Sequence, residues 1–245
     1  MSGIRVFKGL TVWSVAALLL AGCAPVSPPV EKPPPVGPPA GFPEQAYRQA
    51  AAEGAQVYRI DPERSVMVVD VLPEGPLAPT LGHAHTVSTQ RLEGYVQRGE
   101  GAETGQVDLY LSVYDLEVDE PEIRASAGFE SELTQEDIRG TRRNMLVEVL
   151  EAERYPWVRL RAEPLASRDG DVLRLAVDLT LHGQTRRLEI PVTLTGSSDT
   201  IEARGSFSLH QSEFGIEPFS ALGGGLRVKD QLDFRFRLIA EALGG

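Results

Sequence analysis

The chain has 245 residues, 42% of them hydrophobic, and a formal net charge of −11. This length and hydrophobic content suit one medium folded domain or two small ones. The acidic surface repels phosphate backbones, which argues against a nucleic-acid partner, and it disfavours adhesion to anionic lipid without an anchor.

Residues 1–22 have the features of a cleaved lipoprotein signal peptide. Arg5 and Lys8 supply a positive end, and the apolar stretch at residues 10–20 is shorter than the ~20 residues that span a bilayer as a helix. The stretch runs into Leu-Ala-Gly-Cys23, which resembles a bacterial lipobox, and Cys23 is the only cysteine in the chain. We therefore expect Cys23 to carry lipid, palmitate included. The alternative is an ordinary secretory signal followed by a chance cysteine.

Residues 23–56 are predicted to be a lipid-anchored, proline-rich linker that ends in a short helix. Nine of the 18 prolines lie between residues 25 and 43, and such a stretch forms an extended spacer on the order of 60 Å at ~3.1 Å per residue. The prolines at 33–35 leave open a partner that recognises proline. Residues 44–53 read as a helix closed by Gly54.

The position after the cysteine favours one cellular location. Ala24 stands where an Asp tends to retain lipoproteins at the inner membrane, so we expect the protein on the periplasmic face of the bacterial envelope, anchored in the outer membrane. Removal of Arg5 and Lys8 with the signal would lower the net charge from −11 by two, to −13. The membrane contact is therefore expected to depend on the lipid at Cys23.

From residue 57 onward, apolar and polar residues alternate with period two, the pattern of strands with one buried face. Short polar turns join most of these segments, which implies antiparallel pairing. A meander of eight or nine strands hides its edges best by closing, so the predicted fold class is all-β, an eight-stranded antiparallel β-barrel. The expected strands are residues 57–60, 65–72, 85–98, 106–118, 157–163, 172–182, 186–195, 200–210 and 226–239.

Residues 134–153 lack this alternation and instead place apolar residues at helical spacing. Thr134 and Asp137 fit a capping box at the start of a helix, and Gly140 is expected to interrupt it. The helix is expected to plug or cover one mouth of the barrel.

Five separated motifs resemble the YceI-like family of polyisoprenoid-binding, lipocalin-like periplasmic proteins, in the right order over residues 57–240. The most specific are residues 178–186 (DLTLHGQTR) and 154–158 (RYPWV), supported by residues 58–65, 137–145 and 212–216. The resemblance implies a lipocalin-like barrel around an apolar tunnel that holds an isoprenoid, quinone or fatty-acid-like lipid. The sequence contains no Gly-x-Ser-x-Gly elbow, His-Glu-x-x-His motif or calcium loop, so we expect no enzyme activity and no cofactor. The sequence departs from the family pattern at residues 81–85, and residues 73–79 look inserted.

Alternation and resemblance together assign a set of apolar side chains to the lumen as ligand-binding candidates. Small inward residues such as Ala203 and Gly205 are expected to leave room there, although a packed core that binds nothing remains the alternative. The candidates are Val107, Leu109, Leu111, Leu173, Leu175, Val177, Leu179, Leu188, Ile190, Val192, Phe207, Phe214, Phe234 and Phe236.

His83 and His85 give the sharpest alternative function. On a strand, residues two apart point to the same side and could share a metal ion or associate with haem, with His182 and His210 as further ligands. The other interpretation is that His83 or His85 forms a hydrogen bond at the barrel mouth, for example to a ligand head group. Because no carboxylate is fixed beside the pair in sequence, the prediction includes no metal site.

Other features admit plainer interpretations. Arg142 and Arg143 either contact an anionic head group or lie on a solvated helix face. The glycines at 223–225 precede a strand, so they indicate a flexible turn that lets residues 214–222 fold over an opening, not a phosphate site. A domain that binds a protein partner, and a homodimer, both remain open.

Overall fold

The computed structural model describes residues 36–99, 104–169 and 171–244. The predicted signal peptide, Cys23 and the first part of the linker lie outside the described residues. No helix in the described ranges is long and apolar enough to cross a membrane.

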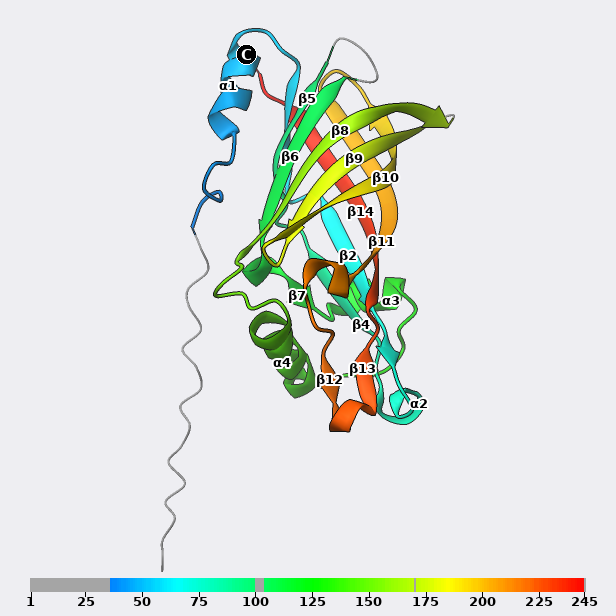
Figure 1. Cartoon of the computed structure of the whole chain (residues 1–245). Helices are drawn as coiled ribbons and strands as arrows, with labels where there is room; N and C mark the ends of the chain where they lie inside the picture. Colours follow the sequence, from blue (N-terminus) through cyan, green and yellow to red (C-terminus); the bar gives the residue numbers. More distant parts are fainter. Residues whose placement is uncertain (1–35, 100–103, 170, 245) are drawn as a thin grey trace, which may run out of the picture. The chain divides into compact units, whose positions relative to one another are not determined.

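Antiparallel strands form most of the fold (Figure 1). The main sheet consists of β1 Val57–Ile60, β2 Val66–Val71, β4 His85–Thr89, β5 Glu93–Arg98, β6 Gly105–Ser112, β7 Glu117–Val118, β8 Trp157–Asp169, β9 Val172–Leu181, β10 Gln184–Gly196, β11 Thr200–His210 and β14 Gln231–Ala242.

The sheet closes through β14, the last strand in the chain. One edge of β14 pairs with β11, and the other edge pairs first with β2 at Asp233 to Arg237 and then with β1 at Ala240 to Ala242. Next in the barrel, β5 pairs with β1 and β4 pairs with β2. Beyond them, β6 pairs with β5 and β7 pairs with β4. Each of the first three barrel positions is therefore built from two consecutive short strands. With β8, β9, β10, β11 and β14 they complete the eight-stranded antiparallel barrel that the sequence predicts.

Three of the expected strands are divided in the structure. Residues 85–98 form β4 and β5, residues 226–239 include β13 Leu226–Val228 and most of β14, and residues 106–118 are split by the 3-10 turn η1 Val113–Asp115. The Ser112 hydroxyl caps this turn by accepting a hydrogen bond from the Tyr114 backbone at 3.2 Å. Leu92, between β4 and β5, and Val113, in η1, are both buried. The chain therefore stays packed against the core at these two bends.

A small second sheet lies at the lower end of the barrel in Figure 1. It contains β3 Pro73–Glu74, β12 Ser220–Ala221 and β13, and it adjoins α2 Ala78–Leu81 and the 3-10 turn η4 Leu222–Gly224. The segment that looks inserted in the sequence, residues 73–79, pairs with β13 through Pro73 and Glu74. It is therefore part of this small sheet and not a free loop.

Helix α1 Glu44–Ala52 confirms the helix expected at the end of the linker. Tyr47 is only 2% exposed, and its ring stacks on Tyr95 of β5 with 5.2 Å between centroids. Its hydroxyl donates to the Asp108 carboxylate of β6 at 2.7 Å. The linker is thus fixed to the outer wall of the barrel at α1.

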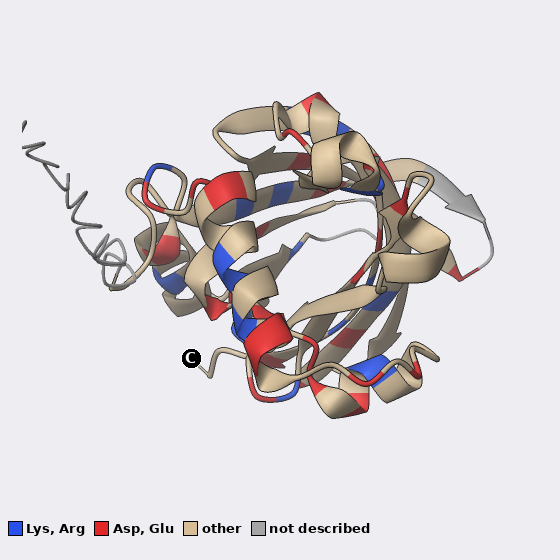
Figure 2. Ribbon diagram, turned by 90° about the horizontal axis from the view of Figure 1, so that it is seen from below, with Lys and Arg blue, Asp and Glu red and all other residues tan. Residues whose placement is uncertain are grey.

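The connection from β7 to β8 is helical. After α3 Pro121–Ser126, helix α4 Gln135–Asn144 begins at Thr134 with the expected capping box, and a π-helical turn, η2 Met145–Val149, continues it. The prediction that Gly140 interrupts the helix is wrong, because α4 runs through Gly140. Figure 2 views the barrel from its lower end in Figure 1, with α4 beside the opening.

Candidate functional site

A cavity of about 500 Å³ occupies the inside of the barrel. Its lining extends from the β5–β6 hairpin, at Arg98 and Gly105, to the lower end at His83 and Leu226. This volume lies within the range of about 300–1,000 Å³ found for small-molecule pockets. The walls between the two ends consist almost entirely of Leu, Val, Ile, Met and Phe side chains. The shape and lining suit one long apolar chain.

Twelve of the fourteen predicted lumen residues line this cavity. They are Val107, Leu109, Leu111, Leu173, Leu175, Val177, Leu179, Ile190, Val192, Phe207, Phe234 and Phe236.

Leu188 and Phe214 do not line the cavity. Phe214 is fully buried in the 3-10 turn η3 Gln211–Phe214, where it packs with the core side chains of β9 and β10. Leu188 packs against the edge of the same cluster. Alternation identifies the face on which such a side chain lies, but not whether it reaches open space.

Sequence reasoning missed Val158, Leu160 and Ala162 of β8, which line the cavity, and two further parts of the wall. One is the N-terminal side of the barrel, where the lining residues are Ile60, Met67, Val69, Val71, Val87 and Val96. Their alternation was detectable, but the short strands carry it weakly. The other is the helical connection, which contributes Thr141, Asn144, Met145, Val149 and Leu150. The helical spacing of Met145 and Val149 was the available signal for this part.

The expectation that Gly205 leaves room for a ligand is wrong. A Cβ atom at this position would lie 2.6 Å from Cζ of Phe236, so the Phe236 ring already occupies the space beside the glycine. Ala203, two residues earlier on β11, does line the cavity. The open volume therefore depends on how large side chains from neighbouring strands fill the gaps beside small ones.

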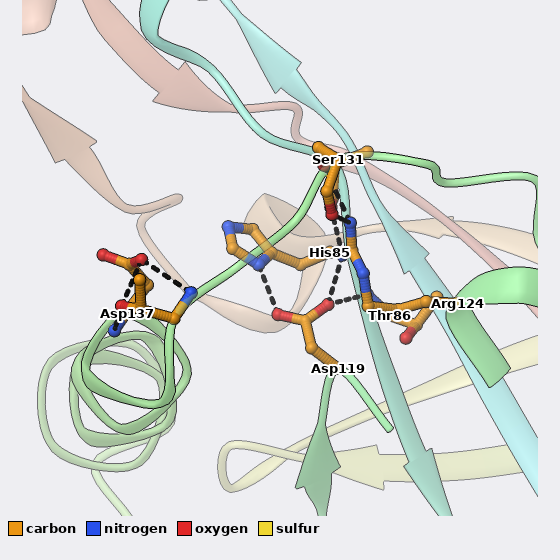
Figure 3. Close-up of polar contacts among 8 residues, drawn as sticks. His85, Thr86, Asp119, Arg124, Ser131 and Asp137 are labelled. Carbon is orange, nitrogen blue, oxygen red and sulfur yellow. Dashed lines mark hydrogen bonds and ion pairs between the residues drawn. The ribbon is translucent and has the colours of Figure 1, made fainter. Parts of the chain in front are cut away.

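A buried polar network supports the lower end of the cavity wall (Figure 3). Nδ1 of His85 lies 2.6 Å from Oδ2 of Asp119, and Oδ1 of Asp119 accepts from the Thr86 backbone at 3.0 Å and from Arg124 at 2.6 Å. Arg124 also donates to the Ala84 carbonyl at 2.7 Å and to Ser131. Asp119 and Arg124 are 2% and 6% exposed. The network connects the segment after β7 to β4.

The contacts in this network control the charge of Asp119. Burial alone would raise the pKa of its carboxyl, but the hydrogen bonds from His85, Thr86 and Arg124 together outweigh burial and hold the pKa below its usual range. An ionised carboxylate only accepts hydrogen bonds, so Nδ1 of His85 must be the donor. In the neutral imidazole, Nε2 is then left as a hydrogen-bond acceptor.

The four histidines do not form one site. His83 and His85 both line the lower end of the cavity, but His83 precedes β4, which begins at His85. His182 lies in the β9–β10 turn with Nε2 3.1 Å from Glu151, and His210 is an exposed residue at the end of β11. Within the described ranges, no group of three or more His, Cys, Asp and Glu residues is placed to hold a metal ion.

The two most specific sequence motifs meet at a structural corner of the molecule. His182 and Gly183 have φ of +51° and +71° and form the tight turn between β9 and β10. The Tyr155 ring lies 4.4 Å from the His182 ring, and a Cβ on Gly183 would come within 2.6 Å of it. His182 and Tyr155 do not line the cavity and pack against each other at this corner, whereas Leu179 and Val158 of the same two motifs do line it.

Arg142 is committed to a contact within the protein. It donates to the Tyr114 carbonyl at 2.7 Å and so ties α4 to η1, while Arg143 is exposed.

The fold and the cavity define a class of protein, the closed antiparallel β-barrels that enclose an elongated apolar chamber. Within this class, the chain belongs to the YceI-like domain family, whose model matches residues 58–240.

Two solved structures share this fold at low sequence identity. BcnA from Burkholderia cenocepacia is 12% identical with a TM-score of 0.53, over 74% of this chain and 98% of that one. A polyisoprenoid binding domain from Saccharophagus degradans implicated in plant cell wall breakdown is 12% identical with a TM-score of 0.52, over 76% and 98% of the two chains. No curated protein sequence matches the chain.

Proposed function

We propose that the protein binds or transports an apolar amphiphile, such as an isoprenoid, a quinone or a fatty-acid-like lipid, inside the barrel without catalysis. The observation that carries this proposal is the cavity of about 500 Å³ with apolar walls along its length. Each buried methylene of a bound chain contributes ~0.8 kcal/mol. The fold shared with a polyisoprenoid binding domain supports the same function.

A matched pair of variants on β11 tests this proposal. Ala203 lines the cavity, whereas Ser206 is exposed on the outer face of the same strand. A203F adds a ring inside the chamber and S206F adds the same ring outside. We expect organic extracts of purified wild type and S206F to contain a stoichiometric long-chain lipid by mass spectrometry, and A203F to lose most of it. Wild-type protein that neither retains lipid nor binds an added polyprenol would refute the proposal.

We also propose that lipid on Cys23 holds the barrel on the periplasmic face of the envelope, at the outer membrane. The lipobox-like sequence, the single cysteine and the acidic net charge of −11 support this tether. In fractionated cells, the wild type is expected with outer-membrane vesicles and C23S in the soluble fraction. Co-fractionation of C23S with the membrane would count against the tether and leave ligand binding untouched.

A further inference from the structure

The lower end of the cavity offers one oriented polar atom to whatever enters. His85 lies two residues before Val87 on β4, so both side chains are on the inward face of the strand. His85 also pairs with Val71 of β2, and all three residues line the cavity. Its side chain is 19% exposed. Figure 3 shows the second ring nitrogen, Nε2, pointing away from Asp119. Among the residues that the structure describes, the hydrogen bond of the His85 ring is made at Nδ1, to Asp119.

The carboxylate behind the ring fixes which nitrogen carries the proton. Asp119 is held by the Thr86 backbone and by Arg124, so it cannot turn away from His85. Since the carboxylate accepts at Nδ1, neutral His85 presents a lone pair at Nε2 to the cavity. A ligand group that satisfies this atom must donate a hydrogen bond.

The neighbouring charges favour an uncharged donor. Arg124 is already paired with Asp119 at 2.6 Å, and Arg227, another lining residue, is paired with Glu74 at 3.2 Å. The Asp137 carboxylate at the start of α4 is a further negative charge near His83 and His85. An anionic head group would therefore be repelled by the nearby carboxylates, and both arginines that could attract it are already paired.

We propose that Nε2 of His85 accepts a hydrogen bond from the hydroxyl of an uncharged amphiphile, a long-chain alcohol or a quinol, and that Asp119 is the positioning residue that sets this preference. The inference rests on the proposed lipid-binding function and adds the chemistry of the head group. It separates alcohols and quinols from aldehydes and quinones, which present only acceptors.

The variant D119N tests the role of Asp119 without removing its side chain. The asparagine oxygen can keep the bonds from Thr86 and Arg124, which leaves its amide to donate to Nδ1 of His85. The proton of His85 then moves to Nε2, which becomes a donor. Asp119 has φ of +58°, a conformation that asparagine also tolerates.

The probes are geranylgeraniol and geranylgeranial, which share one chain and differ in the terminal hydroxyl or aldehyde. We expect the purified wild type to bind the alcohol about tenfold more tightly than the aldehyde, because the aldehyde leaves Nε2 without a donor. In D119N this ratio should fall to about one, and the nitrogen chemical shifts of His85 should report the change of tautomer. H85F keeps the Asp119–Arg124 pair and should lose affinity for the alcohol alone.

The outcomes separate the two proposals. Equal binding of alcohol and aldehyde by the wild type, or an unchanged ratio in both D119N and H85F, would overturn the head-group inference while ligand binding stands. If the wild type binds neither probe and holds no other long-chain lipid, the proposed function fails and the inference fails with it.

Discussion

Asp119 and Arg124 form a buried ion pair behind His85, a residue of the cavity wall, with 2.6 Å between Oδ1 and Nη1. Removing charged groups from water is costly, and an ion pair offsets that cost only when its remaining hydrogen-bond positions are also satisfied. Here the Thr86 backbone, the Ala84 carbonyl and Ser131 satisfy them. The loss of either partner therefore leaves an uncompensated charge inside the protein.

We predict that D119A lowers the free energy of unfolding at pH 7 by about 3 kcal/mol, because Arg124 is left buried without its carboxylate. The folded-state pKa of Asp119 is depressed, so its stabilisation is complete above the unfolded-state value near 4 and is lost as the pH falls through the folded value. The difference between wild type and D119A in urea unfolding should therefore shrink below about pH 4.

A surface ion pair provides the control for this measurement. Asp178 is 42% exposed and lies 3.3 Å from Arg187, so D178A should change stability by less than about 1 kcal/mol. If D119A is as stable as D178A at pH 7, or if the stability that D119A loses relative to wild type increases in acid, the buried ion pair does not stabilise the fold as predicted.

The sequence predicted single functional residues only partly. One of its two interpretations of the His83 and His85 pair placed His83 or His85 at a barrel mouth, and both line the lower end of the cavity. It gave no sign of Asp119 or Arg124, which lie 34 and 39 positions after His85. Neither residue belongs to a motif, and contacts between segments so far apart depend on how the strands and α3 pack. Local patterns carry no information about that packing.

Secondary-structure elements were predicted well where one local rule decides them. Strands β9, β10 and β11 follow their alternation, and the capping box sets the start of α4 at Thr134. The predicted boundaries of the elements were wrong where tertiary contacts determine them. Gly140 costs about 1 kcal/mol relative to alanine within a helix, and the capping box of α4 and the packing of Ile138 in α4 and Met145 in η2 against the core offset this cost.

Helix α1 shows how a predicted element can have an unpredicted role. An isolated helix of its length is marginal in water. Tyr47 and Phe42 dock it against Tyr95 and Tyr110 on the barrel wall. The alternation identified Tyr110 only as a polar-face residue, and the cover over that face comes from the linker helix itself.

At the scale of the whole molecule, the sequence predicted a closed barrel but could not decide between an open tunnel and a packed core. The inward residues are the same in both cases. The difference lies in how rings such as Phe236 are placed, since its ring fills the space beside Gly205 while Ala203 faces the cavity. That placement depends on the register of β11 against β14, where Gly205 lies opposite Phe236.

Because the barrel is closed, we expect the affinity for a ligand to depend on the length of its chain only until the chain fills the cavity. Straight-chain alcohols of increasing length test this prediction. Each methylene that enters the apolar chamber should tighten binding by up to about fourfold, less the cost of ordering the chain. Once the chain fills the chamber, further methylenes remain in water and the dissociation constant should level off. In A203F the break should come at a shorter chain, and in S206F at the wild-type length. Affinity that rises without a break would instead indicate adsorption to an open apolar surface.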